Sequence, residues 1–372
     1  MNPAEENEVR RILEKGLCTP EQVQEAEAIQ RQMEAMGLRP RSVPEVLCEK
    51  GYLEGSDLQE IQKEETTVHG REKIAGYEIV ELLGRGAMGS VYKARQVSLD
   101  RIVALKVLDA DLAKDEGYAG RFLEEARSVA RLSHTNLISG IDVGEDDGIP
   151  YLVMEFADGV TLSRLLNRGG AMDEERALLI AQQVARALDH AHKGGVVHGD
   201  VRPENVIITS DGVTKLCDLG IARRPLIAGD AEGGALRRTP DYISPEQARG
   251  HTEVGPGADV YGLGATLFHM LTGRVLFPAE SREAVLAKQL TEPAPSPRPF
   301  APEMAAETEA LLDRCLQKGP AERYPDAASL TQALEAAVAA VQAARTGAAP
   351  AAAGGPAPAG GAPRPRRRHR RR

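Results

Sequence analysis

The stretch His198-Gly199-Asp200-Val201-Arg202-Pro203-Glu204-Asn205, followed by Cys217-Asp218-Leu219-Gly220, decides the fold of this chain. It places a carboxylate, an amide five residues later and a second carboxylate shortly after, with β-branched runs between them. Carboxylate and amide oxygens are the ligands that a hard divalent cation prefers. The pattern therefore suits a site that holds a hydroxyl, a metal ion and a triphosphate in one line.

A glycine-rich turn lies upstream, in Leu83-Gly84-Arg85-Gly86-Ala87-Met88-Gly89-Ser90-Val91. Its glycines let the backbone approach phosphates without a Cβ clash, although a flexible hairpin explains the pattern equally well. The turn joins two strand-like runs, unlike the strand-to-helix setting of a dinucleotide fold. Val103-Ala104-Leu105-Lys106 then places a lysine inside an apolar strand, as either a solvated edge residue or a phosphate ligand.

These motifs closely resemble those of eukaryotic-type (Hanks-type) bacterial Ser/Thr protein kinases, from about Tyr77 to Leu334. The resemblance implies an α+β, bilobal protein-kinase-like fold with a β-rich N-lobe and an α-helical C-lobe. It implies an ATP-dependent, non-specific serine/threonine protein kinase, a transferase that uses Mg²⁺ and acts on protein substrates.

The resemblance also assigns roles to individual residues. Asp200 orients the substrate hydroxyl, and Arg202 stands where the family has Lys, so Asp200, Arg202 and Asn205 form the catalytic set. Asn205 and Asp218 bind the metal. The nucleotide site comprises the glycine-rich turn, the strand residues Ala104 and Lys106, the helix acid Glu125 that pairs with Lys106, Met154 behind the adenine, and the backbone of Glu155 and Ala157.

Two departures from the family pattern concern regulation. Gly199 replaces the usual Arg before the catalytic Asp, which makes this a non-RD variant. No Ser, Thr or Tyr lies between Arg223 and Arg238. Both the arginine that would bind a phosphate and a Ser, Thr or Tyr that would be phosphorylated are therefore absent from these positions. We expect an enzyme that phosphorylation of this segment does not switch on.

The alternative is a nucleotide-binding pseudokinase that works as a scaffold, which Gly199, Arg202 and Arg238 favour. The retention of Lys106, Glu125, Asp200, Asn205 and Asp218 favours activity, because a decayed site usually loses a metal ligand or the Lys.

Composition divides the chain into a small helical module (1–70), a kinase domain (77–340) and a disordered tail (345–372). In the module, Ile12-Leu13-Glu14-Lys15-Gly16-Leu17 reappears as Leu47-Cys48-Glu49-Lys50-Gly51-Tyr52, with both glycines placed as left-handed helix C-caps. Pro20 suits a first helical position. The module is weakly similar to the N-terminal domain of type II secretion ATPases. It is interpreted as a helical interaction module that binds a regulatory partner.

The kinase region predicts strands at 77–83, 90–96, 101–108, 137–143 and 150–156, and helices at 120–132, 173–192, 258–271, 281–290, 305–316 and 326–344. The 173–192 helix carries Leu178, Ala181, Val184 and Leu188 on one face.

The charge distribution is asymmetric. The net charge is −9, but residues 364–372 hold seven Arg, so the remainder carries 39 basic against 55 acidic residues. The tail is open to three interpretations: it contacts nucleic acid or another acidic surface, it folds back on the acidic body, or it only solubilises the chain. A salt titration of nucleic-acid binding against a chain ending at Ala344 separates them.

Four well-separated cysteines and the lack of an apolar run of about 20 residues predict reduced thiols, no transmembrane segment and a cytoplasmic location.

Overall fold

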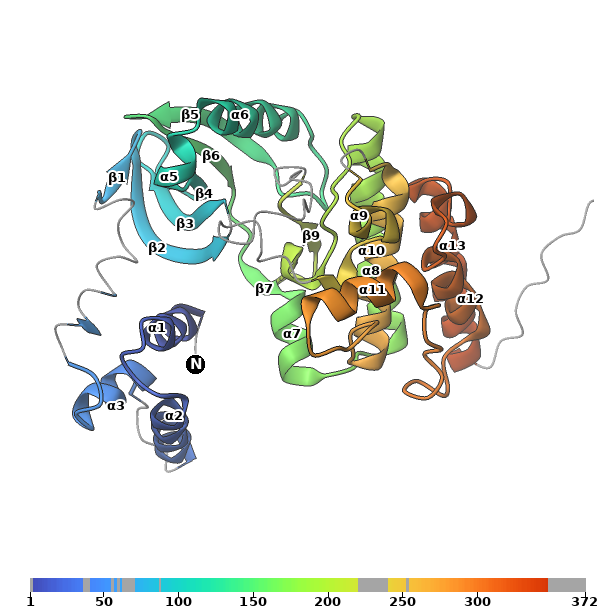
Figure 1. Cartoon of the computed structure of the whole chain (residues 1–372), viewed down its shortest axis with the longest axis horizontal. Coiled ribbons are helices and arrows are strands. Elements are labelled where there is room, and N and C mark those ends of the chain that lie inside the picture. Colours follow the sequence, from blue (N-terminus) through green and yellow to red (C-terminus); the bar gives the residue numbers. More distant parts are fainter. Residues whose placement is uncertain are drawn as a thin grey trace, which may run out of the picture.

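Two unequal lobes, one rich in strands and one helical, make up most of the molecule (Figure 1). The computed structural model describes residues 3–35, 41–54, 57–58, 61, 71–86, 88–219, 240–251 and 254–346. The chain passes from the first lobe to the second between β6 (Ile149–Glu155) and β7 (Gly159–Thr161). The two-lobed α+β architecture predicted from the sequence is confirmed. The predicted disordered tail lies outside the described residues, apart from its first two positions.

The strand-rich lobe contains one antiparallel sheet in the order β1-β2-β3-β4-β6-β5. Its other strands are β1 (Lys73–Ile74), β2 (Tyr77–Gly86), β3 (Gly89–Gln96), β4 (Arg101–Leu108) and β5 (Gly140–Asp146). The strand β5 begins later than predicted because Leu137 forms a bridge with Leu216 of the helical lobe instead. Residues 103–108 of β4 are all buried, as expected of a central strand with both faces covered.

Two helices follow β4, namely α5 (Ala110–Ala113) and α6 (Glu116–Ala130). The predicted start of the second helix, at residue 120, was too late. Asp115 caps α6 with its side chain, which accepts from the Tyr118 N–H at 3.1 Å, so the helix begins directly after it. Phe122 and Ala126 of α6 are buried in the same core as Leu152 and Met154 of β6.

The helical lobe is built around α8 (Glu174–Lys193), which packs against α10 (Pro256–Thr272) and α13 (Ala327–Thr346). The predicted face of α8 is confirmed, because Leu178, Ala181, Val184 and Leu188 are all buried. Burial stabilises each such leucine by roughly 1.5–3 kcal/mol, so packing outweighs helix propensity here. The remaining elements are α7 (Leu162–Gly169), η1 (Pro203–Asn205), β8 (Val206–Thr209), β9 (Thr214–Leu216), η3 (Pro240–Tyr242), α9 (Pro245–Ala248), α11 (Arg282–Thr291), α12 (Ala306–Cys315) and η4 (Pro320–Glu322).

The N-terminal segment forms α1 (Pro3–Glu14), α2 (Pro20–Ala35) and α3 (Val43–Glu49) around a small core of its own. Gly16 and Gly51 have φ angles of +68° and +72°, so the predicted left-handed positions are confirmed. Pro20 begins α2, also as predicted. The helix α1 lies beside β2 of the strand-rich lobe (Figure 1).

A buried carboxylate ties the three N-terminal helices together. Glu5 Oε1 accepts from the Gln30 side-chain amide and from the Val43 backbone N–H, both at 2.6 Å. The same Gln30 amide donates to the Arg41 carbonyl at 2.8 Å. Because Glu5 and Gln30 are both buried, these bonds replace water contacts that the two side chains have lost.

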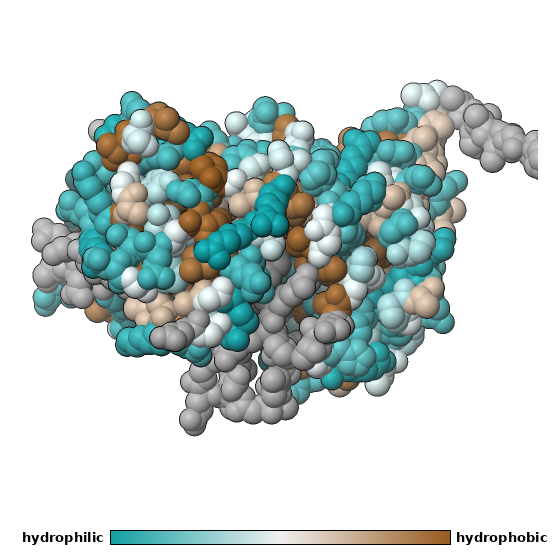
Figure 2. Space-filling model, turned by 90° about the horizontal axis from the view of Figure 1, so that it is seen from above, coloured by the Kyte–Doolittle hydropathy of each residue, from teal (hydrophilic) through white to brown (hydrophobic). Residues whose placement is uncertain are grey.

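The surface is mostly hydrophilic, and hydrophobic side chains gather over the strand-rich lobe and along the meeting of the two lobes (Figure 2). Most of the exposed large apolar residues in the described chain belong to the β2–β4 region: Val80, Leu83, Val97, Leu99 and Ile102. Within the described residues, none of the helices combines the length and apolar character that crossing a bilayer demands.

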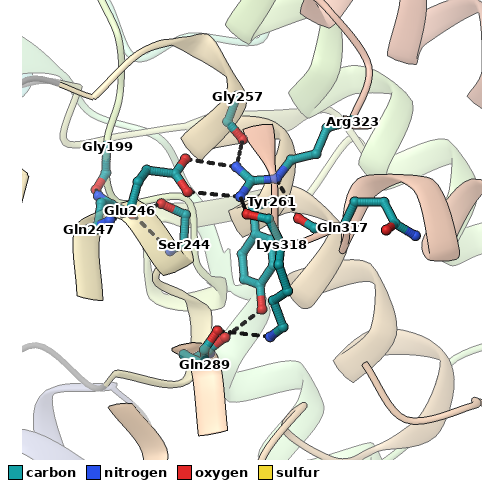
Figure 3. Close-up of polar contacts among 10 residues, drawn as sticks. All are labelled: Gly199, Ser244, Glu246, Gln247, Gly257, Tyr261, Gln289, Gln317, Lys318 and Arg323. Carbon is teal, nitrogen blue, oxygen red and sulfur yellow. Dashed lines mark hydrogen bonds and ion pairs between the residues drawn. The ribbon is translucent and has the colours of Figure 1, made fainter. Parts of the chain in front are cut away.

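A buried ion pair anchors α9 to Arg323, which lies between α12 and α13 (Figure 3). Arg323 donates to both carboxylate oxygens of Glu246, at 2.7 and 2.8 Å. Its other N–H groups donate to the carbonyls of Gln317, Gly257 and Lys318. Burial alone would raise the pKa of Glu246, but the bond with Arg323 more than offsets it and the pKa lies below its ordinary value.

Lys318 lies beside this pair. Its ammonium donates to the Gln289 carbonyl at 2.8 Å and lies 4.7 Å from the centre of the Phe277 ring. Burial first, and then the neighbouring Arg323 charge, lower the pKa of Lys318 to about 8.

Candidate active site

The predicted catalytic loop, residues 198–205, lies between α8 and β8 and is held by Asp259 of α10. The Asp259 carboxylate is almost fully buried and accepts from the backbone N–H groups of His198 (2.8 Å) and Gly199 (2.7 Å). It also contacts His192 Nε2 at 2.7 Å. The helix α10 therefore fixes the backbone of the two residues that precede Asp200.

His198 is a structural residue in this loop. Its buried ring accepts from the Asp200 N–H at Nδ1 (3.1 Å), and Nε2 donates to the Cys217 carbonyl at 2.9 Å. Both ring nitrogens are thus used by the backbone, which ties the catalytic loop to the segment that carries Asp218. Burial raises the pKa of the Cys217 thiol, so Cys217 stays protonated and serves as packing.

Gly199 adopts a backbone conformation that suits glycine. Its φ angle is +73°, where an L-residue is less stable by roughly 1–2 kcal/mol. An added Cβ would meet only the Gln247 amide, at 3.9 Å, so space does not exclude a side chain. The backbone conformation gives an independent physical reason for a glycine at this position.

The amide and the two carboxylates singled out in the sequence lie together. Asn205 Nδ2 donates to the Asp200 carbonyl at 2.8 Å and to Asp200 Oδ2 at 3.1 Å. The Cys217 N–H donates to the Asn205 carbonyl at 2.9 Å, which places Asp218 next to this pair. Asp218 has a φ angle of +61°, a strained conformation of the kind that gathers at functional sites.

The donor set fits a magnesium ion that also takes phosphate oxygens. Asn205 and Asp218 offer one amide and one carboxylate, and Mg²⁺ is usually bound by one or two such groups together with phosphates and water. In the described part of the chain, no group of three or more His, Cys, Asp or Glu side chains is placed to hold a metal ion.

Lys106 comes from β4 of the other lobe and reaches Asp218. Its Nζ donates to Asp218 Oδ1 at 2.7 Å, and the Lys106 side chain is only 10% exposed. Lys106 and Glu125 form no ion pair in this structure. Glu125 lies instead at a cavity of about 350 Å³ that α6 shares with Gly195 and Val196.

The residues predicted to enclose a nucleotide line one region of the strand-rich lobe. Ala104 pairs with Met154 across β4 and β6, and both are buried. Gly89 lies so close to β4 that a Cβ would stand 2.0 Å from the Val107 carbonyl oxygen, and its φ angle is +149°, so this position requires glycine.

The other predicted nucleotide residues lie nearby. Leu83 and Arg85 are exposed, Gly84, Met88, Ser90 and Val91 are partly buried, and Ala87 lies outside the described residues. The Glu155 side chain pairs with Lys215 at 2.5 Å, and Ala157 follows at the start of the connection between the lobes.

Arg202 has a partner that the sequence did not suggest. Its Nε donates to Glu204 Oε2 at 2.7 Å, and the Ser163 hydroxyl donates to Glu204 Oε1 at 3.2 Å. Burial opposes both charges, but their mutual hydrogen bond keeps the pKa of Arg202 above and that of Glu204 below its ordinary value. The sequence pattern alone predicts no role for Glu204.

Gln247 is a second residue that sequence reasoning missed. Its side-chain Nε2 donates to the Gly199 carbonyl at 2.7 Å, and its Oε1 accepts from the Ser244 N–H at 3.0 Å (Figure 3). The spacing of Ser244 and Gln247, which is that of a capping box, was the available signal.

Comparisons with known proteins identify the family of this chain. A model of the protein kinase domain family matches residues 77–337. A probable serine/threonine-protein kinase of Streptomyces coelicolor is 39% identical over 266 residues, which cover 70% of this chain and 39% of the relative. Serine/threonine-protein kinase PrkC of Bacillus subtilis is 37% identical over 256 residues, which cover 68% of this chain and 39% of PrkC. The Mycobacterium tuberculosis PknI kinase domain, a crystal structure, matches with a TM-score of 0.57 and 29% identity, covering 71% of this chain and 96% of that domain.

The chain therefore belongs to the protein kinase family, and its two lobes are those of a protein kinase. The resemblance to Hanks-type bacterial Ser/Thr kinases is confirmed over this domain. The matched region spans about two fifths of the length of these curated relatives, so the activity, substrates and partners of the whole protein are proposals.

Proposed function

We propose that this protein is an ATP-dependent serine/threonine protein kinase that transfers the γ-phosphoryl group of ATP, with Mg²⁺, to hydroxyls of other proteins. One observation carries the proposal: a continuous chain of short contacts joins the predicted chemical groups. Lys106 bonds Asp218, the neighbouring Cys217 bonds Asn205, and Asn205 bonds Asp200. The match to the protein kinase domain family supports it.

Each group in this chain has a task in the proposed reaction. Asp200 orients the acceptor hydroxyl and takes its proton. Asn205 holds Asp200 Oδ2, and Oδ1 has no hydrogen-bond partner among the described residues. Asn205 and Asp218 hold Mg²⁺, which when bound neutralises phosphate charge. Phosphoryl transfer through a loose transition state depends mainly on such positioning and charge neutralisation.

Cationic and backbone groups hold the phosphates. Lys106 binds them from the strand-rich lobe, with Glu125 as its carboxylate partner in the nucleotide-bound enzyme. The backbone of the glycine-rich turn covers them, because its glycines allow a close approach. Arg202 offsets the charge of the transferred group, with its guanidinium aligned by Glu204. Ala104, Met154, Glu155 and Ala157 enclose the adenine. Incorporation of radiolabelled phosphate from ATP into a protein acceptor, beside variants of Asp200 and Lys106, tests the proposal.

We further propose that this kinase is a non-RD variant whose activity does not depend on phosphorylation of residues 221–243. Gly199 supplies no cation to grip a phosphate, and its φ of +73° suits a glycine. The part of this segment that lacks Ser, Thr and Tyr, between Arg223 and Arg238, lies outside the described residues.

Phosphatase treatment is expected to leave the turnover number of the purified enzyme unchanged. Mass spectrometry of active protein should accordingly find no phosphosite between 221 and 243 that turnover requires. A site in that interval whose removal abolishes turnover would refute the idea.

The N-terminal helices are proposed to form a regulatory module that acts through β2 and binds a partner there. Two features support this: the helices have a core of their own, and α1 lies beside the strand that leads into the glycine-rich turn. The similarity to type II secretion ATPases is retained only as a proposal.

Glu5→Ala is expected to loosen this module and change the KM for ATP at least threefold. The substitution leaves the buried Gln30 and Val43 donors without their acceptor, and each unsatisfied group costs about 1–3 kcal/mol. Glu25→Ala is the matched control, because Glu25 pairs with Lys50 and Tyr52 on the exposed face. Unchanged KM values in both variants would argue against regulation through β2.

A cytoplasmic location remains a proposal, supported by four cysteines that are all free thiols. The proposed contact of the Arg-rich tail with nucleic acid or an acidic surface concerns residues 364–372, outside the described chain.

A further inference from the structure

Gly199 leaves the backbone next to the catalytic aspartate with more conformational freedom than another residue would allow. Glycine tolerates backbone rotations that other residues resist, so the peptide group between Gly199 and Asp200 needs external restraint. The peptide group before Gly199 is held by Asp259, which accepts from the Gly199 N–H. The peptide group after Gly199 includes the Asp200 N–H, which donates a hydrogen bond to His198 Nδ1.

The carbonyl end of that second peptide group is held by Gln247. Its Nε2 donates to the Gly199 oxygen at 2.7 Å, so the peptide is fixed at both its N–H and its C=O. The opposite atom of the same amide, Oε1, accepts from both the Ser244 N–H and the Ser244 hydroxyl. The orientation of the Gln247 amide is therefore determined from α9.

The helix α9 is itself immobilised. Glu246, the residue before Gln247, forms the buried bidentate pair with Arg323 (Figure 3). Ser244 is fully buried at the start of the helix. Gln247 thus links the immobilised helix α9 to the backbone beside Asp200 through one neutral hydrogen bond.

We propose that Gln247 is a positioning residue for phosphoryl transfer, one that couples α9 to the Gly199–Asp200 peptide without any phosphate. This inference rests on the proposed kinase activity and deepens it. It explains how a chain with glycine before its catalytic Asp keeps that Asp oriented: a neutral amide fixes the backbone beside Asp200 to α9, and neither a phosphate nor an arginine is needed for this contact.

Gln247→Glu tests the role with little other change. A glutamate keeps the capping box, since Glu and Gln serve equally as acceptors for the Ser244 N–H, but it has no donor for the Gly199 carbonyl. In the full-length protein, the turnover number is expected to fall about tenfold while the KM for ATP stays within twofold. Hydrogen exchange of the Asp200 amide is expected to speed up by a similar factor.

Gln317→Glu is the matched control. It makes the same chemical change nearby, at an exposed side chain that donates to the Asp313 carbonyl. Turnover of Gln247→Glu within twofold of the wild type, or an equal loss in Gln317→Glu, would overturn the inference. If Gln247→Glu does not fold, Gln247→Ala is measured in its place by the same exchange experiment, and unchanged exchange at Asp200 again overturns it. A wild type no more active than Asp200→Asn would instead refute the proposed function itself.

Discussion

Asp200→Asn is expected to lower the rate of phosphoryl transfer by about 10²–10⁴-fold, the range that general acid–base groups contribute. Asparagine has nearly the same shape as aspartate and keeps an oxygen for the contact with the Asn205 amide. It lacks the negative charge and cannot take the hydroxyl proton. The fold and the affinity for ATP should therefore change little. The measurement is incorporation of radiolabelled phosphate with Mg²⁺, together with the Kd for ATP.

Lys106→Ala is the second variant, and it should affect ATP binding as well as the rate of transfer. The substitution removes the ammonium that contacts Asp218 across the two lobes, so we expect loss of ATP affinity as well as turnover. Equal incorporation by the wild type and both variants would show that the chain has no intrinsic transferase activity. That result, with ATP binding retained, is the behaviour of a pseudokinase.

The local features of the site could be predicted because each depends on a short stretch of sequence. Strand β4 is apolar apart from Arg101 and Lys106, and Gly16 and Gly51 mark left-handed positions by residue type alone. The convergence of Asp200 and Asn205 also follows from close spacing, since five residues of one loop bring the amide to the carboxylate.

The pairings between distant segments could not be read from the sequence. Lys106 and Asp218 are 112 positions apart, and which carboxylate the lysine meets depends on how the two lobes and α6 are placed. The bond from Gln247 to Gly199 spans 48 positions and requires α9 to be fixed by Arg323. Such contacts are set by tertiary packing, for which neither periodicity nor composition carries a signal.

Arg323→Ala is expected to produce the largest loss of stability among single substitutions of the described charged residues. All five N–H donors of this almost fully buried side chain have acceptors, two of them on Glu246. Removing the guanidinium leaves the Glu246 carboxylate buried without its partner, which costs about 3–5 kcal/mol. For a domain of this size the melting temperature should fall by roughly 6–20 °C in a calorimetric scan.

Arg186→Ala is the matched control for this prediction, because Arg186 pairs with Glu335 at 3.0 Å while both side chains are about half exposed. A surface pair of this kind contributes about 0–1 kcal/mol, so its loss should barely move the melting temperature. The melting temperature of Arg323→Lys should lie between those of Arg323→Ala and Arg186→Ala, because lysine keeps the charge but cannot form the bidentate contact. Because α9 also carries Gln247, the Arg323 variants should lose turnover below their melting temperatures, whereas Arg186→Ala should not. Equal melting temperatures for Arg323→Ala and Arg186→Ala would mean that the buried pair is not the anchor of α9.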